Sequence, residues 1–174
     1  MIRVVVGELA EQAVDGLVRP VRSDLAPVSA ASRDIALAAG DELEERLARL
    51  GTLPIGGAVL TPAGRLAAAY LIHVVVMSEE EPQTAVSVQR ALRNGLRRAA
   101  DWSLASIALP PLGLSVGMVE PEESARALVE ILFDHLDEGA APLDLTIVVG
   151  SDFEARLFDG LVQEMARARS ATSN

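Results

Sequence analysis

The chain has 174 residues, of which half are apolar and only 3% aromatic, and it carries a formal net charge of −10. A chain of this length can bury one sizeable core, which must here be built from aliphatic side chains. The negative charge excludes a general nucleic-acid binder with a dominant basic face. The chain has no cysteine and only two histidines, His73 and His135, which excludes disulfides and thiolate or histidine-rich metal sites.

No apolar run approaches the ~20 residues that a membrane span needs. The N-terminus lacks the layout of a signal peptide. We therefore expect a cytoplasmic protein without a membrane partner. Residues 1–170 are expected to form a single domain, followed by a frayed tail over residues 171–174.

Two short apolar segments open the chain. Ile2–Val6 is typical of a strand, and a short helical piece follows at Glu8 and Leu9. Asp15–Val18 predicts a second strand. Pro20 is expected to end it, because proline lacks the N–H that a strand donates.

The next element is predicted to be a helix that begins near Ser29 or Ser32, since serine suits a helix cap. An apolar stripe with a spacing of four follows, formed by Ile35, Ala39, Leu43 and Leu47. This spacing predicts one helix with the stripe against a sheet.

The middle of the chain predicts strands and a long helix. Pro54–Leu66 is typical of a strand, a turn and the approach to the next strand. Tyr70–Val76 is almost continuously apolar, as a central strand requires. A helix from about Gln83 to Asp101 follows, and Trp102 is expected to cap the core at its end. The predicted buried residues of this helix are Val88, Leu92, Leu96 and Ala99.

The stretch from Ala105 to Arg126 joins a buried strand to a helix through a glycine loop. Ile107–Leu109 is apolar, and the two prolines after it end the strand. Gly113 and Gly117 permit positive φ and a close approach of backbone to ligand. Pro121–Glu123 suits a first helical turn. Ligands of open α/β sheets bind at such strand-to-helix junctions, so this stretch predicts an anion-binding mouth.

The C-terminal part predicts one more strand, Asp144–Val149, and a helix that begins with the capping box Ser151–Glu154. The face that this helix is expected to bury consists of Phe153, Leu157, Leu161 and Met165. Strands that alternate with helices, several of them uniformly apolar, predict an α/β fold, a three-layer α/β/α sandwich.

Four stretches resemble macro domains, the modules that bind ADP-ribose and sometimes hydrolyse it. The family's motifs Gly-Asp-Ile and Asp-Ala-Ile-Val are matched by Gly7–Leu9 and Asp15–Val18. The family sequence is also close to Pro54–Leu66 over the whole length of this stretch. The second ligand loop of the family resembles Ala105–Arg126. The resemblance covers nearly the whole chain. It implies a mixed, mostly parallel central sheet and a phosphate-bearing ligand such as ADP-ribose.

The resemblance also implies a set of ligand-binding residues. Glu8 stands where the family's aspartate accepts a hydrogen bond from the adenine amino group, and Leu9 offers the adjacent amide. The family's first glycine run is absent, which narrows the pocket, but a serine-rich helix start and the second loop remain. The predicted ligand-binding residues are Glu8, Leu9, Arg19, Arg22, Ser29, Ser32, Gly113, Leu114, Ser115, Val116, Gly117 and Met118.

Arg19 and Arg22 stand where the family has two asparagines. An arginine only donates hydrogen bonds and cannot act as a general base. In the cleft it would hold a phosphate or carboxylate in bidentate fashion. The alternative is that both arginines lie on the surface, paired with Asp24 or Asp34.

Ser32 stands where hydrolytic members carry the aspartate that activates water. A serine without a nearby base does not replace that aspartate, and capping a helix is its ordinary role. Asp34 fills the role only if the alignment slips. We therefore predict no catalytic residue and no cofactor. His73, inside the most apolar strand, is predicted to be a buried structural histidine.

The sequence thus predicts a divergent macro domain that binds ADP-ribose or a related nucleotide or phosphate ligand without efficient hydrolysis. Two alternatives remain open. One is an ADP-ribosyl hydrolase with displaced catalytic residues. The other is a ligand-free module that works through protein contacts, including contacts within a homo-oligomer.

Overall fold

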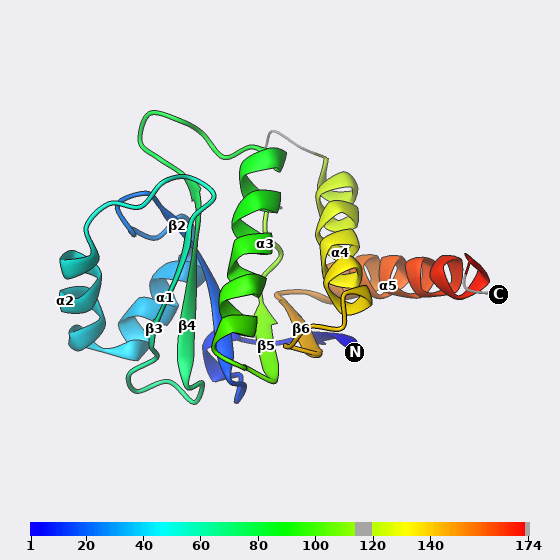
Figure 1. Ribbon diagram of the computed structural model, residues 1–174, viewed down its shortest axis with the longest axis horizontal. Helices are drawn as coiled ribbons and strands as arrows, with labels where there is room; N and C mark the ends of the chain where they lie inside the picture. The colour runs from blue at the N-terminus through cyan, green and yellow to red at the C-terminus, as the bar shows by residue number, and fades with distance from the viewer. Residues whose placement is uncertain (114–119, 173–174) are drawn as a thin grey trace.

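The computed structural model describes residues 1–113 and 120–172 and contains a single sheet with helices on both faces (Figure 1). The strands are β1 (Ile2–Val6), β2 (Gly16–Arg22), β3 (Ala58–Pro62), β4 (Tyr70–Met77), β5 (Ser106–Leu109) and β6 (Asp144–Val149). The helices are α1 (Ala30–Ala39), α2 (Asp41–Leu50), α3 (Ala85–Asp101), α4 (Pro121–Asp137) and α5 (Asp152–Thr172), with a short 3-10 helix η1 (Leu9–Glu11).

The sheet is mixed but mostly parallel. Its strand order is β1-β6-β5-β2-β4-β3. Only β3 runs antiparallel to its neighbour, while the other neighbouring pairs are parallel. The carboxyl ends of the five parallel strands therefore meet at one edge of the sheet, where ligands of such sheets bind.

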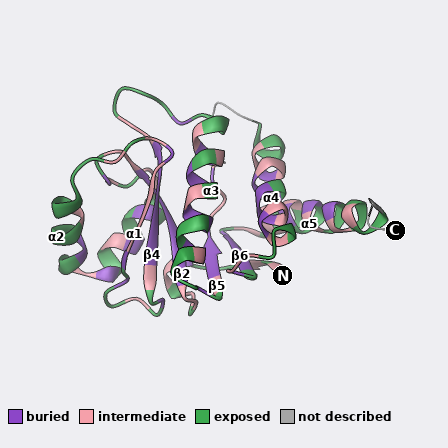
Figure 2. Ribbon diagram, viewed as in Figure 1, coloured by how far each residue is buried: buried purple, intermediate pink, exposed green. Residues whose placement is uncertain are grey.

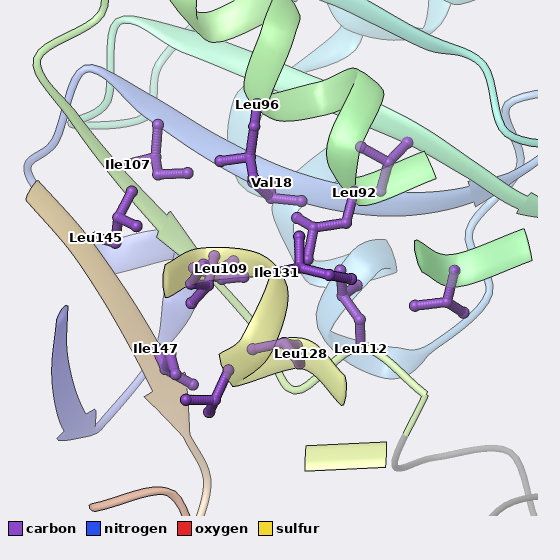
Figure 3. Packing of buried hydrophobic residues seen from close by; sticks show 14 of the residues in the cluster. Val18, Leu92, Leu96, Ile107, Leu109, Leu112, Leu128, Ile131, Leu145 and Ile147 are labelled. Atoms are coloured by element: carbon purple, nitrogen blue, oxygen red, sulfur yellow. The ribbon is translucent and has the colours of Figure 1, made fainter. Parts of the chain in front are cut away.

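The larger core lies between one face of the sheet and the helices α3, α4 and α5. In Figure 1, α3 and α4 pass in front of the strands. Figure 3 shows Leu92 and Leu96 of α3 and Leu128 of α4 directed towards the strand residues that they cover. The strand residues of this cluster that the figure labels are Val18, Ile107, Leu109, Leu145 and Ile147.

The opposite face of the sheet is covered by η1, α1 and α2 through a second apolar cluster. Figure 2 shows buried strands between helices whose outer sides are exposed. The predicted three-layer α/β/α sandwich is therefore confirmed. Within the described part of the chain, no helix combines the length and the apolar character needed to cross a bilayer.

The prediction that Pro20 ends the second strand is wrong, because β2 continues to Arg22. On the β5 side, β2 is paired only at Gly16 and Leu17. Pro20 lies beyond that short ladder, where no neighbouring strand needs its missing N–H.

The single helix predicted along the apolar stripe is divided at Gly40, which has φ 99° and separates α1 from α2. Ile35 and Ala39 are buried from α1, and Leu43 from α2. The apolar residues keep a spacing of four although the chain turns at Gly40, because both short helices pack an apolar side against the same core.

The face predicted for the last helix is wrong at its first residue. Phe153 is 69% exposed, whereas Phe158 is fully buried beside Leu161 and Met165. The helix itself runs to Thr172, two residues into the segment expected to fray. Trp102 does end α3 but is 56% exposed, and its ring contacts Tyr70 edge-on.

Candidate functional site

The carboxyl edge of the sheet contains a point where the connections diverge. From β2 the chain runs through α1, α2 and β3 to β4, whereas from β5 it runs through α4 to β6 on the other side. Neighbouring strands whose connections leave in opposite directions create a crevice at their carboxyl ends. β2 and β5 are paired only at Gly16 and Leu17, so their ladder ends well before the carboxyl end of β2. We call this place the β2–β5 crevice.

The loop from β2 to α1 is tightly folded. Arg22 donates its backbone N–H to the carbonyl of Ala26, and Leu25 adopts φ 67° and donates to the carbonyl of Arg22. Ser29 caps α1, because its side chain accepts from the N–H of Ser32. The predicted helix start is thereby confirmed.

The first turn of α1 carries no negative charge that would repel an anion. No acidic residue lies in its first turn, whereas the first turn of α4 carries Glu122 and Glu123. A helix N-terminus offers free N–H groups and a positive dipole end. Of these two helix starts, that of α1 is therefore better suited to an anion.

Arg19 is not on the surface and does not pair with an acidic residue. The alternative of a surface pair with Asp24 or Asp34 is therefore wrong for Arg19. Its side chain is 1% exposed. Its Nε donates to the carbonyl of Ser32 at 2.9 Å, and one Nη donates to the carbonyl of Leu25 at 3.3 Å. The guanidinium therefore ties β2 to the loop and to the first turn of α1.

The same Nη atom of Arg19 lies 3.3 Å from Nδ1 of His73, and Nε2 of His73 lies 2.8 Å from the Thr61 hydroxyl. Since arginine has no acceptor, Nδ1 must accept and Nε2 must carry the proton that faces Thr61. Burial, followed by the charge of Arg19, lowers the pKa of His73 to about 3. The prediction of a buried structural histidine is confirmed.

Arg22 is half-buried and forms ion pairs with two exposed acids. It contacts Asp24 at 2.6 Å and Glu79 at 3.4 Å. The hydrogen bond from Arg22 holds the pKa of the Asp24 carboxyl below its usual range. Of the two interpretations of Arg22, the surface pair with Asp24 is the one that the structure contains.

Ser32 is fully buried, and its hydroxyl donates to the carbonyl of Pro20 at 2.7 Å. It is not the cap of α1, since that role belongs to Ser29. The hydroxyl instead fixes the helix start against β2. Asp34, two residues further along α1, is exposed.

Glu8 and Leu9 follow β1 at the same edge of the sheet. Glu8 is exposed, and Leu9 is 6% exposed and packs in the core of the α1 face. Phe153 lies beyond the carboxyl end of the neighbouring strand β6 and is 69% exposed. An exposed aromatic ring offers a face on which a base can stack. Sequence reasoning missed Phe153 because its spacing from Leu157 suggested the core.

Gly113 begins the loop between β5 and α4 with φ 90°. Its positive φ favours glycine, and a Cβ at this residue would lie 2.5 Å from the Ser124 hydroxyl oxygen, which would have to move. The predicted ligand residues that lie outside the described part of the chain are Leu114, Ser115, Val116, Gly117 and Met118. Over residues 1–113 and 120–172, no cluster of three metal-ligating side chains occurs.

Comparisons with known proteins agree on a family. A sequence model described as "Macro domain" matches residues 18–128. An O-acetyl-ADP-ribose deacetylase of Salmonella typhimurium is 30% identical over 169 residues, which is 94% of each chain. A macro domain-containing protein of Listeria monocytogenes is 36% identical over 121 residues, covering 66% of this chain and 69% of the relative.

Solved structures show the same fold at lower identity. The Oceanobacillus iheyensis macrodomain with ADP superposes with a TM-score of 0.81 at 19% identity, over 95% of this chain and 91% of that one. The Trypanosoma brucei macrodomain in complex with ADP-ribose superposes with a TM-score of 0.82 at 20% identity, over 92% of this chain and 68% of that one.

The burial of Arg19 leads to a comparison of two single variants, Arg19→Met and Arg22→Met. Arg19→Met should lower the free energy of unfolding by about 2–4 kcal/mol, because two buried carbonyls and a ring nitrogen lose their donor. Arg22→Met removes an exposed pair and should shift the urea midpoint far less. Equal losses in the two variants would contradict this assignment of roles.

His73 should make stability depend on pH. In the unfolded chain its pKa returns to about 6.5, so below that pH the unfolded state binds a proton that the native state does not. The free energy of unfolding should therefore fall by about 1.4 kcal/mol per pH unit between about pH 6 and pH 3 through this group.

Urea titrations of wild type and His73→Asn from pH 7 to pH 4 would measure this dependence. The carboxylates titrate in both proteins, so the difference between the two slopes isolates His73. Below pH 6, the difference between the two slopes should approach the value for uptake of one proton on unfolding. Parallel curves would show that the imidazole is not held neutral by the fold.

Proposed function

Because the chain belongs to the macro domain family, we propose that it binds ADP-ribose or a related nucleotide at the β2–β5 crevice without hydrolysing it efficiently. The observation that carries this proposal is the reversal of connections between β2 and β5, with the acid-free start of α1 beside it. A ligand phosphate fits such a helix start. The relative named an O-acetyl-ADP-ribose deacetylase, which is similar over almost the whole chain, supports the same class of ligand.

The spacing of the strands supports a long ligand. Glu8 and Phe153 follow β1 and β6, while α1 starts after β2, three strand positions from β1. Neighbouring strands lie ~4.8 Å apart, so the start of α1 is separated by ~10 Å from the end of β6 and by ~14 Å from the end of β1. A nucleoside diphosphate bridges the first of these separations, with its base beside Phe153 and its phosphates at α1, whereas inorganic phosphate reaches only one end.

The side chains beside the crevice favour binding over hydrolysis. Ser32 and Arg22 stand where the family's catalytic aspartate and asparagine are expected. The Ser32 hydroxyl is committed to the Pro20 carbonyl, and Arg22 is paired with Asp24. Neither group is a base that could activate water. The hydrolase alternative therefore depends on Asp34, which is an exposed carboxylate near the start of α1.

The binding proposal predicts a calorimetric signal with ADP-ribose, a weaker one with ADP, and none with inorganic phosphate at the same concentration. Phe153→Ala should weaken ADP-ribose binding about tenfold, since stacking on an aromatic ring contributes ~1–3 kcal/mol per base. Leu143→Ala is the matched control, because Leu143 is 51% exposed at the opposite end of β6. The absence of heat and of NMR shifts at millimolar ADP-ribose would instead favour the ligand-free module.

The chemical part of the proposal predicts no release of acetate from O-acetyl-ADP-ribose, and no release of ADP-ribose from modified carboxylates, above the buffer blank. A turnover on the order of 1 per second, within the ordinary range of enzymes, would support the hydrolase alternative. In that case Asp34→Asn should abolish the activity, while Asp159→Asn, an exposed acid on α5, should retain it.

A further inference from the structure

A second concave site is a groove of about 460 Å³ between the β2–α1 loop, α1 and α2. Figure 1 shows α2 at the outer edge of the molecule, beyond β3. The groove residues used below are Arg19, Leu25, Arg33, Leu37, Leu43 and Leu47. We call this site the α1–α2 groove; its volume lies within the usual range for small-molecule sites.

The floor of the groove contains a buried cation. Arg19 lines the groove although its side chain is 1% exposed. Its partners are two carbonyl oxygens and the neutral ring of His73. Among the described residues, no carboxylate lies within ion-pair distance of Arg19. Burial lowers the pKa of Arg19 to about 10, so it remains charged at neutral pH. A buried charge without a counter-charge is costly, and an anion in the groove would supply one.

The walls determine which anion fits. Leu25 and Leu43 belong to the buried core, and Leu37 is 72% exposed at the rim. The remaining charges of the groove are three acids, Asp24, Asp41 and Glu44, against one base, Arg33. An acidic rim repels ligands that carry several negative charges, whereas one carboxylate with an apolar body meets a cation below and aliphatic side chains around it.

We propose that the α1–α2 groove binds a small aliphatic monocarboxylate, with the carboxylate directed to Arg19 and the hydrocarbon chain against Leu37 and Leu47. The groove includes Arg33 from the first turn of α1 but none of residues 28–32, and its proposed ligand is independent of the proposed nucleotide function. Its ligand is defined by a single negative charge and an apolar tail.

The test uses octanoate as the probe and follows amide shifts of the full chain by NMR. Octanoate should shift residues of α1 and α2 with saturable binding, while octylammonium and inorganic phosphate should not. Leu37→Glu places a negative charge at the rim and should weaken octanoate binding about fivefold. Ala38→Glu is the matched control: Ala38 is an exposed neighbour on α1 that does not line the groove.

Arg19→Gln should abolish octanoate binding if the variant folds; if it does not fold, the pair Leu37→Glu and Ala38→Glu still decides. Equal affinity for octanoate and octylammonium would overturn the proposal, as would equal weakening by the two glutamate variants. Saturating ADP-ribose should leave octanoate binding unchanged. Displacement of octanoate by ADP-ribose would place the carboxylate in the crevice and overturn the proposal. A failure of ADP-ribose to bind would bear on the nucleotide site alone.

Discussion

The contact on which the rest of the carboxyl edge depends is the buried guanidinium of Arg19. It reaches from the middle of β2 to the carbonyls of Leu25 and Ser32, and through His73 it continues to Thr61 on β3. Three strands, the β2–α1 loop and the first turn of α1 are thereby joined by one chain of hydrogen bonds. Buried polar networks of this kind are stabilising only while every member has a partner.

This network sets the position of the start of α1. The carbonyl of Ser32 accepts from Arg19, while its hydroxyl donates to Pro20. Both bonds hold the first turn of the helix against β2, beside the point where the connections of β2 and β5 diverge. The polar side chains that the sequence offers as ligand contacts are thus used to build the scaffold. In the proposed function, recognition is therefore assigned to backbone N–H groups, to Glu8 and to the exposed ring of Phe153.

Much of the fold is readable from the sequence because its strands are uniformly apolar and its helices carry clear start signals. Ser29, Thr84, Pro121 and Ser151 all stand at the beginning of helices. The direction in which a single side chain points is harder to predict from the sequence. Phe153 and Phe158 are five residues apart, which turns them ~140° from one another on a helix, so only one can face the core. The sequence spacing favours Phe153, whereas the core contains Phe158.

Arg19 could not be placed from the sequence for a different reason. A charged residue inside an apolar strand is ordinarily expected at the surface or beside an acid, since burial of a lone charge is costly. Its actual partners are main-chain carbonyls, one of them supplied by the unusual φ of Leu25 in a tight loop. No residue type marks a carbonyl as available, so the compensating groups become visible only when the loop is folded.

The net charge of −10 limits how an anionic ligand can be held. Arg22 is paired with Asp24 and Glu79, and Arg19 is bonded to the carbonyls of Ser32 and Leu25 and lines the α1–α2 groove. Neither of the two arginines that sequence reasoning assigned to the crevice is therefore free there. At physiological ionic strength, charges more than ~8 Å apart are largely screened from one another. The acidic surface therefore mainly lowers the rate at which an anionic ligand associates. Under the proposed function, affinity would come from short-range contacts with the N–H groups of α1 and with the ring of Phe153 after β6. The proposal thus requires a diphosphate to bind an acidic protein without an arginine clamp.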